Sequence, residues 1–337
     1  MRKINALIAV VVLALVAWSG WWWFGATQQE RAVERWLAER RADGWVAEAE
    51  VSVLGFPNRF DMTVEGLTLA DPEAGWAWSA PVFRTFMLSW QPNKVIAEWP
   101  GVHVVSVPGE TVEASAGTFR ASAGFLPTTD LAIDRAVVEA EALTLSGEKG
   151  WSAGLGAAQL SVRRSEAWAE VPNAYDAVFD ARDVAPPEAV RERLARALGG
   201  ALPGRIDRLG LDMTAVLRRP LDRHAVEESD IRPAALEIRR SLIRWGALGL
   251  EAEGRLDVAP DGVPTGRIDL TARNWRAMLA AAERSGAIAP GLATTLRAGL
   301  EVLSLLSSGS DTLSAPLVFA EGRVSLGPVP LGEAPRF

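Results

Sequence analysis

The longest hydrophobic stretch of the chain lies at its N-terminus, where no charged residue occurs between Lys3 and Glu30. Its apolar part, residues 4–24, would form about 31 Å of α-helix at ~1.5 Å per residue. The hydrocarbon core of a bilayer is about 30 Å thick, so this length suits one membrane span. The pattern therefore predicts a transmembrane anchor over residues 1–26.

The residues that flank this span predict its orientation. Arg2 and Lys3 precede it and acidic residues follow, which by the positive-inside rule places the N-terminus in the cytoplasm and the bulk in the periplasm, at the inner membrane. Four tryptophans form the predicted membrane-interface anchor: Trp18, Trp21, Trp22 and Trp23. A cleaved signal peptide and a buried helix of a soluble protein are the alternatives. Cleavage at the small-x-small site of residues 17–19 would leave an exposed Gly-Trp-Trp-Trp-Phe end, so we favour an uncleaved span.

After the span the pattern changes twice. Residues 27–44 predict a charged juxtamembrane helix with one apolar side, ended by Gly44. From Trp45 the period becomes two, as in Phe60, Met62 and Val64, which alternate with polar residues. Turn signals recur at short intervals, including Gly147-Glu148-Lys149-Gly150, and predict many short antiparallel strands to about residue 165.

The clearest alternation lies between residues 248 and 273. Even positions are small or apolar and most odd positions are charged, on both sides of Pro260-Asp261-Gly262-Val263-Pro264. Folding the hairpin symmetrically about Gly262 pairs Asp257 with Arg267, Arg255 with Asp269 and Glu251 with Arg273. Opposite charges across two strands contribute roughly 0.2–1 kcal/mol per pair, so this register is the predicted one.

Helices interrupt the predicted sheet at three places. Pro186-Pro187 opens a helix that Gly199-Gly200 closes; Asn274 is the predicted N-cap of a helix over 275–285; and an apolar helix runs from Pro290 to about Leu306. The chain ends in a hairpin that turns at Glu321-Gly322. The predicted fold is mostly β (α+β): the transmembrane helix, then a large curved antiparallel sheet with the three helices packed on one face. Residues 45–337 form the periplasmic domain, with a possible sub-boundary near 170–203.

Composition narrows the function. The net charge of −7 argues against a nucleic-acid partner, which would need concentrated Lys and Arg. The absence of cysteine excludes thiol catalysis and zinc–thiolate sites.

Candidate chemistry is sparse. Neither His103 nor His224 has a partner at metal-ligand spacing, so a structural or solvated role is predicted for each. Ser146-Gly147-Glu148-Lys149 matches the serine–lysine motif S-x-x-K, but its glycines predict a turn and not the helix that the motif requires. Asp61, Glu65 and Asp71 are the candidate carboxylates for general acid–base chemistry. Asp61 and Glu65 fall on the polar face of an alternating strand, where a solvated charge is expected. The tryptophans at 76, 78, 90 and 99 are interpreted as core residues, with stacking platforms for sugars or lipids as the alternative. No catalytic, metal or cofactor residue is predicted, and no cofactor.

Three segments together resemble a bacterial family. They are Gly55-Phe56-Pro57-Asn58-Arg59-Phe60-Asp61, the stretch from Leu69-Ala70-Asp71-Pro72 to Gly75-Trp76-Ala77-Trp78-Ser79-Ala80-Pro81, and Gln91-Pro92-Asn93-Lys94-Val95-Ile96-Ala97-Glu98-Trp99-Pro100. The family is domain of unknown function 2125, found mainly in Alphaproteobacteria. The resemblance implies an envelope protein and carries over no activity or site residue. The C-terminal half also has a weaker resemblance to AsmA-like proteins, in its order of hairpin, apolar helix and final hairpin. The β-grooves of those proteins are implicated in lipid movement.

These observations lead to an expected function. A membrane-anchored, non-enzymatic periplasmic protein would bind or pass an apolar ligand such as lipid in envelope biogenesis, because a sheet with one apolar face must bury it under helices or around acyl chains. The alternative is an interaction or scaffold module docking on another inner-membrane protein, through the span and the helix after it. A carboxylate-based hydrolase is a third reading, which strand-face alternation does not favour.

Overall fold

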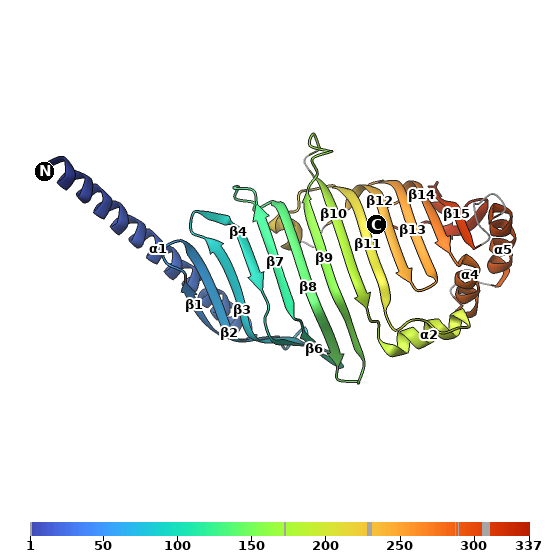
Figure 1. Ribbon diagram of the computed structural model, residues 1–337, viewed down its shortest axis with the longest axis horizontal. Helices are drawn as coiled ribbons and strands as arrows, with labels where there is room; N and C mark the ends of the chain where they lie inside the picture. The colour runs from blue at the N-terminus through green and yellow to red at the C-terminus, as the bar shows by residue number, and fades with distance from the viewer. Residues whose placement is uncertain (1, 172, 228–230, 287, 289, 305–310) are drawn as a thin grey trace. The chain divides into compact units, whose positions relative to one another are not determined.

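The computed structural model describes residues 2–171, 173–227, 231–286, 288, 290–304 and 311–337. The helices in this part of the chain are α1 (Arg2–Ala42), α2 (Glu188–Leu198), α3 (Arg223–Glu227), α4 (Trp275–Arg284) and α5 (Pro290–Ser304). All seventeen strands belong to one antiparallel sheet (Figure 1). The mostly β fold with one large antiparallel sheet that the sequence predicted is therefore confirmed.

The chain divides into two compact units. Unit 1 comprises Met1–Gly124 and Leu143–Gly150, and unit 2 comprises Phe125–Ala142 and Trp151–Phe337. Unit 1 contains α1 and seven strands: β1 (Val46–Leu54), β2 (Arg59–Asp71), β3 (Trp76–Leu88), β4 (Gln91–Glu98), β5 (Val102–Val107), β6 (Glu110–Ser115) and β7 (Thr118–Phe125, whose last residue falls in unit 2). Strand β8 (Ile133–Gly147) has residues in both units. The subdivision expected near 170–203 stays a prediction.

Helix α1 is one continuous helix through the predicted anchor and the juxtamembrane segment. Its most apolar 18-residue window is wholly unburied, and by length and composition it can cross a membrane. Burial begins at Trp18 and is complete at Ala26 and Leu37. Leu37 packs with residues of β1–β3 in one hydrophobic cluster: Ala47, Val64, Leu67, Leu69 and Ala80. The first half of α1 is thus free of the fold, and the second half is part of the core of unit 1.

The strands of unit 1 are interrupted partway along the sheet. The C-terminal half of β3 pairs with β4 and its N-terminal half with β5. In turn β4 pairs with β7, and β5 pairs with β6. Residues 99–101 therefore break one long strand path, and residues 116–117 break the next. Gly101 allows the first break, because its φ is +87° and a Cβ there would lie 2.8 Å from Cγ of Pro81.

Unit 2 is by contrast an uninterrupted antiparallel meander in which each strand pairs with the next. Its strands are β9 (Ser152–Arg164), β10 (Ala174–Val184), β11 (Ile206–Leu217), β12 (Pro233–Trp245), β13 (Leu248–Val258), β14 (Pro264–Arg273), β15 (Thr312–Ala320), β16 (Arg323–Leu326) and β17 (Val329–Glu333). Sequence patterning predicted the β13–β14 and β15–β16 hairpins, the latter turning at Glu321-Gly322 as expected, but not β10, β11, β12 or β17.

The predicted register of the β13–β14 hairpin is wrong. Asp257 lies opposite Thr265, and Arg255 lies opposite Arg267. The reason is the turn: Ala259 and Val263 close a three-residue loop centred on Asp261, and Gly262 occupies its last position with a φ of +84°. Such a loop places glycine in the left-handed position before the returning strand and not at the apex. The expected faces survive, since Leu256 and Val258 are buried and the charges lie outside.

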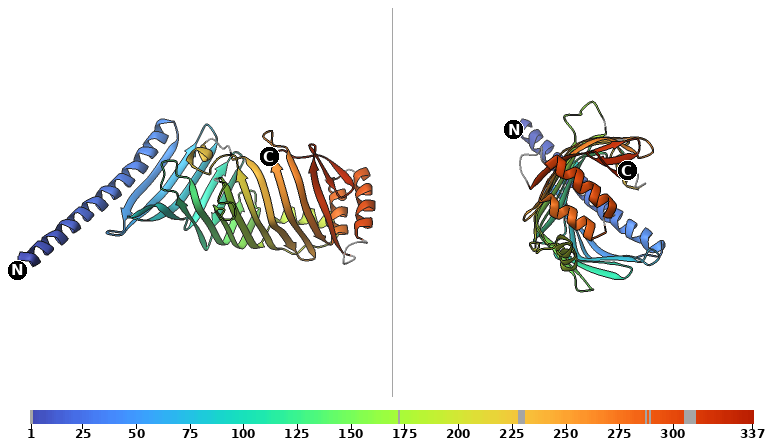
Figure 2. Two further views of the ribbon diagram at one scale, coloured as in Figure 1. Left: turned by 90° about the horizontal axis from the view of Figure 1, so that it is seen from above. Right: turned by 90° about the vertical axis from the view of Figure 1, so that its right-hand side faces the viewer.

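Two helices close the C-terminal end of unit 2 (Figure 2). Helices α4 and α5 pack on β15 and β17 through one cluster: Trp275, Leu279, Leu296, Leu300, Leu313, Ala315 and Val329. Asn274 precedes α4 as predicted, but it adopts a left-handed conformation and makes no side-chain cap bond. Helix α2 begins and ends where predicted, yet none of its residues is buried, and Val190 and Leu194 are exposed. Leu306, the predicted end of the last helix, lies outside the described residues.

Candidate functional site

An apolar pocket of about 220 Å³ lies in unit 1 where the strand paths break. Trp99 and Gly101 belong to the break between β4 and β5, and Ala116 to the break between β6 and β7. The backbone N–H of Trp99 still donates to the carbonyl of Phe119 in β7 at 3.0 Å, and regular pairing stops after it. The pocket therefore lies where the strand paths are interrupted.

Aromatic side chains form most of the pocket wall. The ring centroids of Trp99 and Phe119 lie 5.0 Å apart, and Trp99 lies 5.4 Å from Phe83. Trp78 lines another side, and its ring is stacked on His103 with centroids 6.1 Å apart. Apart from His103 and Ser115, every lining residue is apolar. An engineered apolar cavity of about 150 Å³ stays dry and binds benzene, so this space suits one ring or a short acyl segment.

His103 is the buried polar group of this pocket, with an exposed fraction of 8 %. The indole Nε1–H of Trp78 donates to its Nδ1 at 3.4 Å, whereas its Nε2 is buried and has no hydrogen-bond partner. Because Nδ1 accepts, the neutral ring carries its proton on Nε2. The buried Nε2–H of His103 is thus an unsatisfied donor, which costs about 1–3 kcal/mol in apolar surroundings.

Trp78 also connects the pocket to the anchor helix. Besides lining the pocket, it packs against the cluster that contains Leu37 of α1 and Val64, Leu69 and Ala80 of β2 and β3. The same face of this sheet therefore carries the packed half of α1 and the pocket.

The four predicted interface tryptophans divide into two pairs. Trp18 donates its indole N–H to the carbonyl of Pro57 at 3.0 Å, and Trp22 donates to the carbonyl of Arg59 at 2.7 Å. Trp21 and Trp23 are exposed. Sequence patterning did not find this division, although the i, i+4 spacing of Trp18 and Trp22 places them on one helix face.

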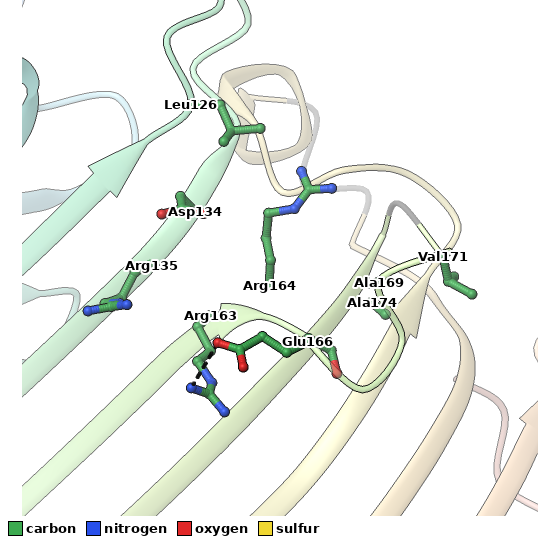
Figure 3. A pocket seen from close by; sticks show the side chains of 10 residues that line it. Leu126, Asp134, Arg135, Arg163, Arg164, Glu166, Ala169, Val171 and Ala174 are labelled. Carbon is green, nitrogen blue, oxygen red and sulfur yellow. Dashed lines mark ion pairs between the residues drawn. The ribbon is translucent and has the colours of Figure 1, made fainter.

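A second pocket, of about 290 Å³, lies in unit 2 and is charged (Figure 3). Its arginines are Arg135, Arg163 and Arg164, and its carboxylates are Asp134 and Glu166. Arg163 lies 3.7 Å from Glu166 and 3.6 Å from Asp176, so its charge is offset within the protein. The balanced charge gives this pocket little to attract an anion.

Beside it, Asp176 is the centre of a polar network across β9–β12. Thr214 donates to its carboxylate at 2.7 Å, and Arg239 lies 3.4 Å away. Burial raises the pKa of Asp176, but the Thr214 hydrogen bond and the charges of Arg239 and Arg163 outweigh it, and the net pKa is lowered. A carboxylate that its partners keep ionised is suited to stabilising the fold and is a poor proton donor.

The remaining candidates lie apart from one another. Lys149 contacts Glu110 at 3.1 Å in the β8–β9 turn, so the S-x-x-K motif is on a hairpin, as its glycines predicted. Asp61 pairs with Arg59 at 2.7 Å, and Asp71 caps its own turn. Within the described part of the chain, no group of three or more His, Asp or Glu side chains could hold a metal ion.

Sequence reasoning found the aromatic residues but not the pocket. Of the four tryptophans interpreted as core, Trp78 and Trp99 are half-buried pocket walls, Trp76 stacks edge-on with Trp45 at 5.1 Å, and Trp90 is exposed. The usable signal was Trp99-Pro100-Gly101, a strand-breaking segment directly after an aromatic residue.

Comparison with known proteins gives one match. No curated protein and no solved structure matches the chain significantly. The family model for an uncharacterised protein conserved in bacteria matches residues 22–335, from the packed half of α1 to the end of β17. The chain therefore belongs to this family, DUF2125.

Proposed function

We propose that this protein is a non-enzymatic, membrane-anchored protein of the inner membrane that binds or passes an apolar ligand such as lipid in envelope biogenesis. Arg2 and Lys3 support a cytoplasmic N-terminus and a periplasmic location for both units. The aromatic pocket of unit 1 is the observation that carries the ligand proposal. It is apolar, and it lies in the unit that contains the anchor.

The lining of this pocket specifies the ligand further. Nε2 of His103 is buried away from the open space, so the accessible wall is apolar and suits a hydrocarbon group. Such groups include the acyl chains of fatty acids and acyl esters. The volume of about 220 Å³ accommodates part of an acyl chain and not a whole phospholipid.

Native mass spectrometry of the full chain, extracted in mild detergent, tests this proposal. We expect a bound acyl-containing species. Ala114 faces His103 across the β5–β6 pair and lines the pocket, so Ala114→Leu should fill the space and reduce the bound species several-fold. Val102 lies on the other face of β5, and Val102→Leu is the matched control with unchanged occupancy. Equal occupancy in the wild type and Ala114→Leu would contradict the pocket assignment.

Docking on another inner-membrane protein is the second candidate, because Trp36 is exposed on the juxtamembrane half of α1 beside the guanidinium of Arg40. The same mass spectra distinguish it: a docking module would carry a stoichiometric protein and no lipid. A carboxylate hydrolase has less support, since Asp61 and Asp176 are paired with arginines. The likeness to AsmA-like proteins stays a prediction.

A further inference from the structure

Two turns of unit 1 lie near Trp18, the residue at which α1 begins to pack on the fold. The first consists of Leu54 at the end of β1 and the β1–β2 turn, residues 55–58, whose Pro57 carbonyl accepts from Trp18. The second is the β3–β4 turn, residues 89–90, which joins the first because the backbone N–H of Ser89 donates to the carbonyl of Asn58 at 3.0 Å. We call these two segments the membrane-facing turns. Their apolar side chains are exposed: Leu54 by 67 %, Phe56 by 56 % and Trp90 by 53 %.

The length of the part of α1 that is free of the fold indicates how close these turns lie to the bilayer. The helix packs on unit 1 from Trp18 onward, so only residues 4–17 of the apolar stretch are free of the fold. Fourteen residues give about 21 Å of helix at ~1.5 Å per residue. A hydrocarbon core is about 30 Å thick, which leaves a deficit of about 9 Å. The helix can cross the bilayer only if residues 18–24, and whatever packs on them, also enter it.

The polar groups of the first turn are suited to such surroundings. Within a bilayer each backbone N–H and C=O needs a partner in the protein. The carbonyls of Pro57 and Arg59 accept from the indoles of Trp18 and Trp22, and the carbonyl of Asn58 accepts from Ser89. The N–H groups of Asn58 and Arg59 donate to the carbonyl of Gly55 at 3.2 and 2.9 Å.

Aromatic side chains also pack between α1 and the β1–β2 turn. Trp22 lies edge-on to Phe56 with ring centroids 5.4 Å apart, and it stacks on Phe60 at 5.8 Å. The indole N–H groups of Trp18 and Trp22 are therefore used in hydrogen bonds to the protein. The exposed Trp21 and Trp23 are free to contact lipid headgroups. Arg59 follows the turn, is exposed, and has its charge offset by Asp61 at 2.7 Å.

We infer that the membrane-facing turns insert into the outer interface of the bilayer that α1 crosses, so that the protein is embedded through its first sheet as well as its helix. The expected depth of about 9 Å agrees with the roughly 5–10 Å at which interfacial elements lie. This inference rests on the anchoring part of the proposed function and not on the pocket.

The chain contains no cysteine, which makes single-cysteine labelling a clean test. The full-length protein is reconstituted in vesicles of phosphatidylcholine and phosphatidylglycerol, and an environment-sensitive fluorophore is attached to Phe56→Cys. Iodide in the buffer and spin-labelled phospholipid serve as quenchers. Val107→Cys is the matched control, because Val107 is also an exposed apolar residue of unit 1 and precedes the β5–β6 turn, and Ala14→Cys reports the span itself.

We expect the label at position 56 to be quenched by the spin-labelled lipid several-fold more than the label at 107, and to be shielded from iodide. A label at 56 as open to iodide as the label at 107, with position 14 shielded, would overturn the inference and leave the anchor intact. Iodide access at position 14 as well would instead contradict the proposed anchor. A second label at Trp90→Cys keeps the test decisive if Phe56→Cys does not fold.

Discussion

The two units use the same antiparallel pairing with different results. In unit 1 the strand paths break at residues 99–101 and 116–117, and an apolar pocket forms at the breaks. In unit 2 the meander from β9 to β17 is continuous, and its terminal apolar face is covered by α4 and α5. The apolar face at the end of unit 2 is thus buried by helices, whereas unit 1 keeps an apolar space where its strand paths break.

The polar faces differ as well. Unit 2 carries arginine–aspartate pairs across neighbouring strands, such as Arg208 with Asp180 at 2.5 Å and the Asp176 network. Unit 1 instead contains many tryptophans and contacts the anchor. Under the proposed function, unit 1 would provide the membrane and ligand contacts, and unit 2 would provide a sheet with a charged face.

The largest effect is expected where unit 2 is closed by its helices. Leu300 of α5 is buried among Leu296, Leu313 and Val329, so Leu300→Ala should lower the free energy of unfolding by about 2–5 kcal/mol. Leu194→Ala in α2 is the matched control, expected to cost far less because Leu194 is exposed. Urea unfolding of the detergent-solubilised protein measures both; equal losses would show that α5 does not close the sheet.

Local sequence patterns predicted most of the helices and strands, and the register of the β13–β14 hairpin shows the limit of such patterns. Period-two alternation located β13 and β14 and assigned their faces, because it depends on neighbours in the chain. The pairing depends on where the turn places Gly262, and shifting the centre from Gly262 to Asp261 moves Asp257 from Arg267 to Thr265. Such a shift of two residues preserves each face, so hydrophobic patterning cannot detect it.

The candidate site was less predictable for the same reason. His103 appeared as a lone histidine in an apolar strand, and its role depends on Trp78, which lies 25 residues away in the chain. The pocket is lined in part by residues of two breaks, 99–101 and 116–117, which come together only through strand pairing. The prediction of the anchor tryptophans, in contrast, needs only a local signal, the apolar stretch of residues 4–24.

The Asp176 network is expected to have the second-largest effect. Asp176→Asn keeps the size of the side chain but loses the charge that Arg239 and Arg163 contact, at a cost of about 1–3 kcal/mol. Asp269→Asn, at an exposed surface pair, is the control.

The cost of Asp176→Asn should depend on pH in a defined direction. The pKa of Asp176 is lowered in the folded protein, so its ionised form contributes stability that is present above the unfolded pKa of about 4. That contribution is lost as the pH falls through the folded pKa. We therefore expect the difference between wild type and variant to be full at pH 5 and to shrink toward pH 3. A difference that is constant over this range would show that the charge of Asp176 is not what stabilises unit 2.

The smallest predicted effect concerns the attachment of unit 1 to its helix. The carboxylate of Glu30 in α1 accepts from the backbone N–H of the buried Val53 at 2.9 Å, so it satisfies a donor of β1 that no strand pairs. Glu30→Ala should cost about 0.5–1.5 kcal/mol and speed amide exchange at Val53, whereas Glu34→Ala, at an exposed position of the same helix, should do neither. Hydrogen exchange resolved to β1 measures this directly. Unchanged protection at Val53 would mean that the apolar contacts of Leu37 and Ala26 alone hold α1 on the sheet, and unit 1 would then resemble unit 2 in depending on its helix through packing only.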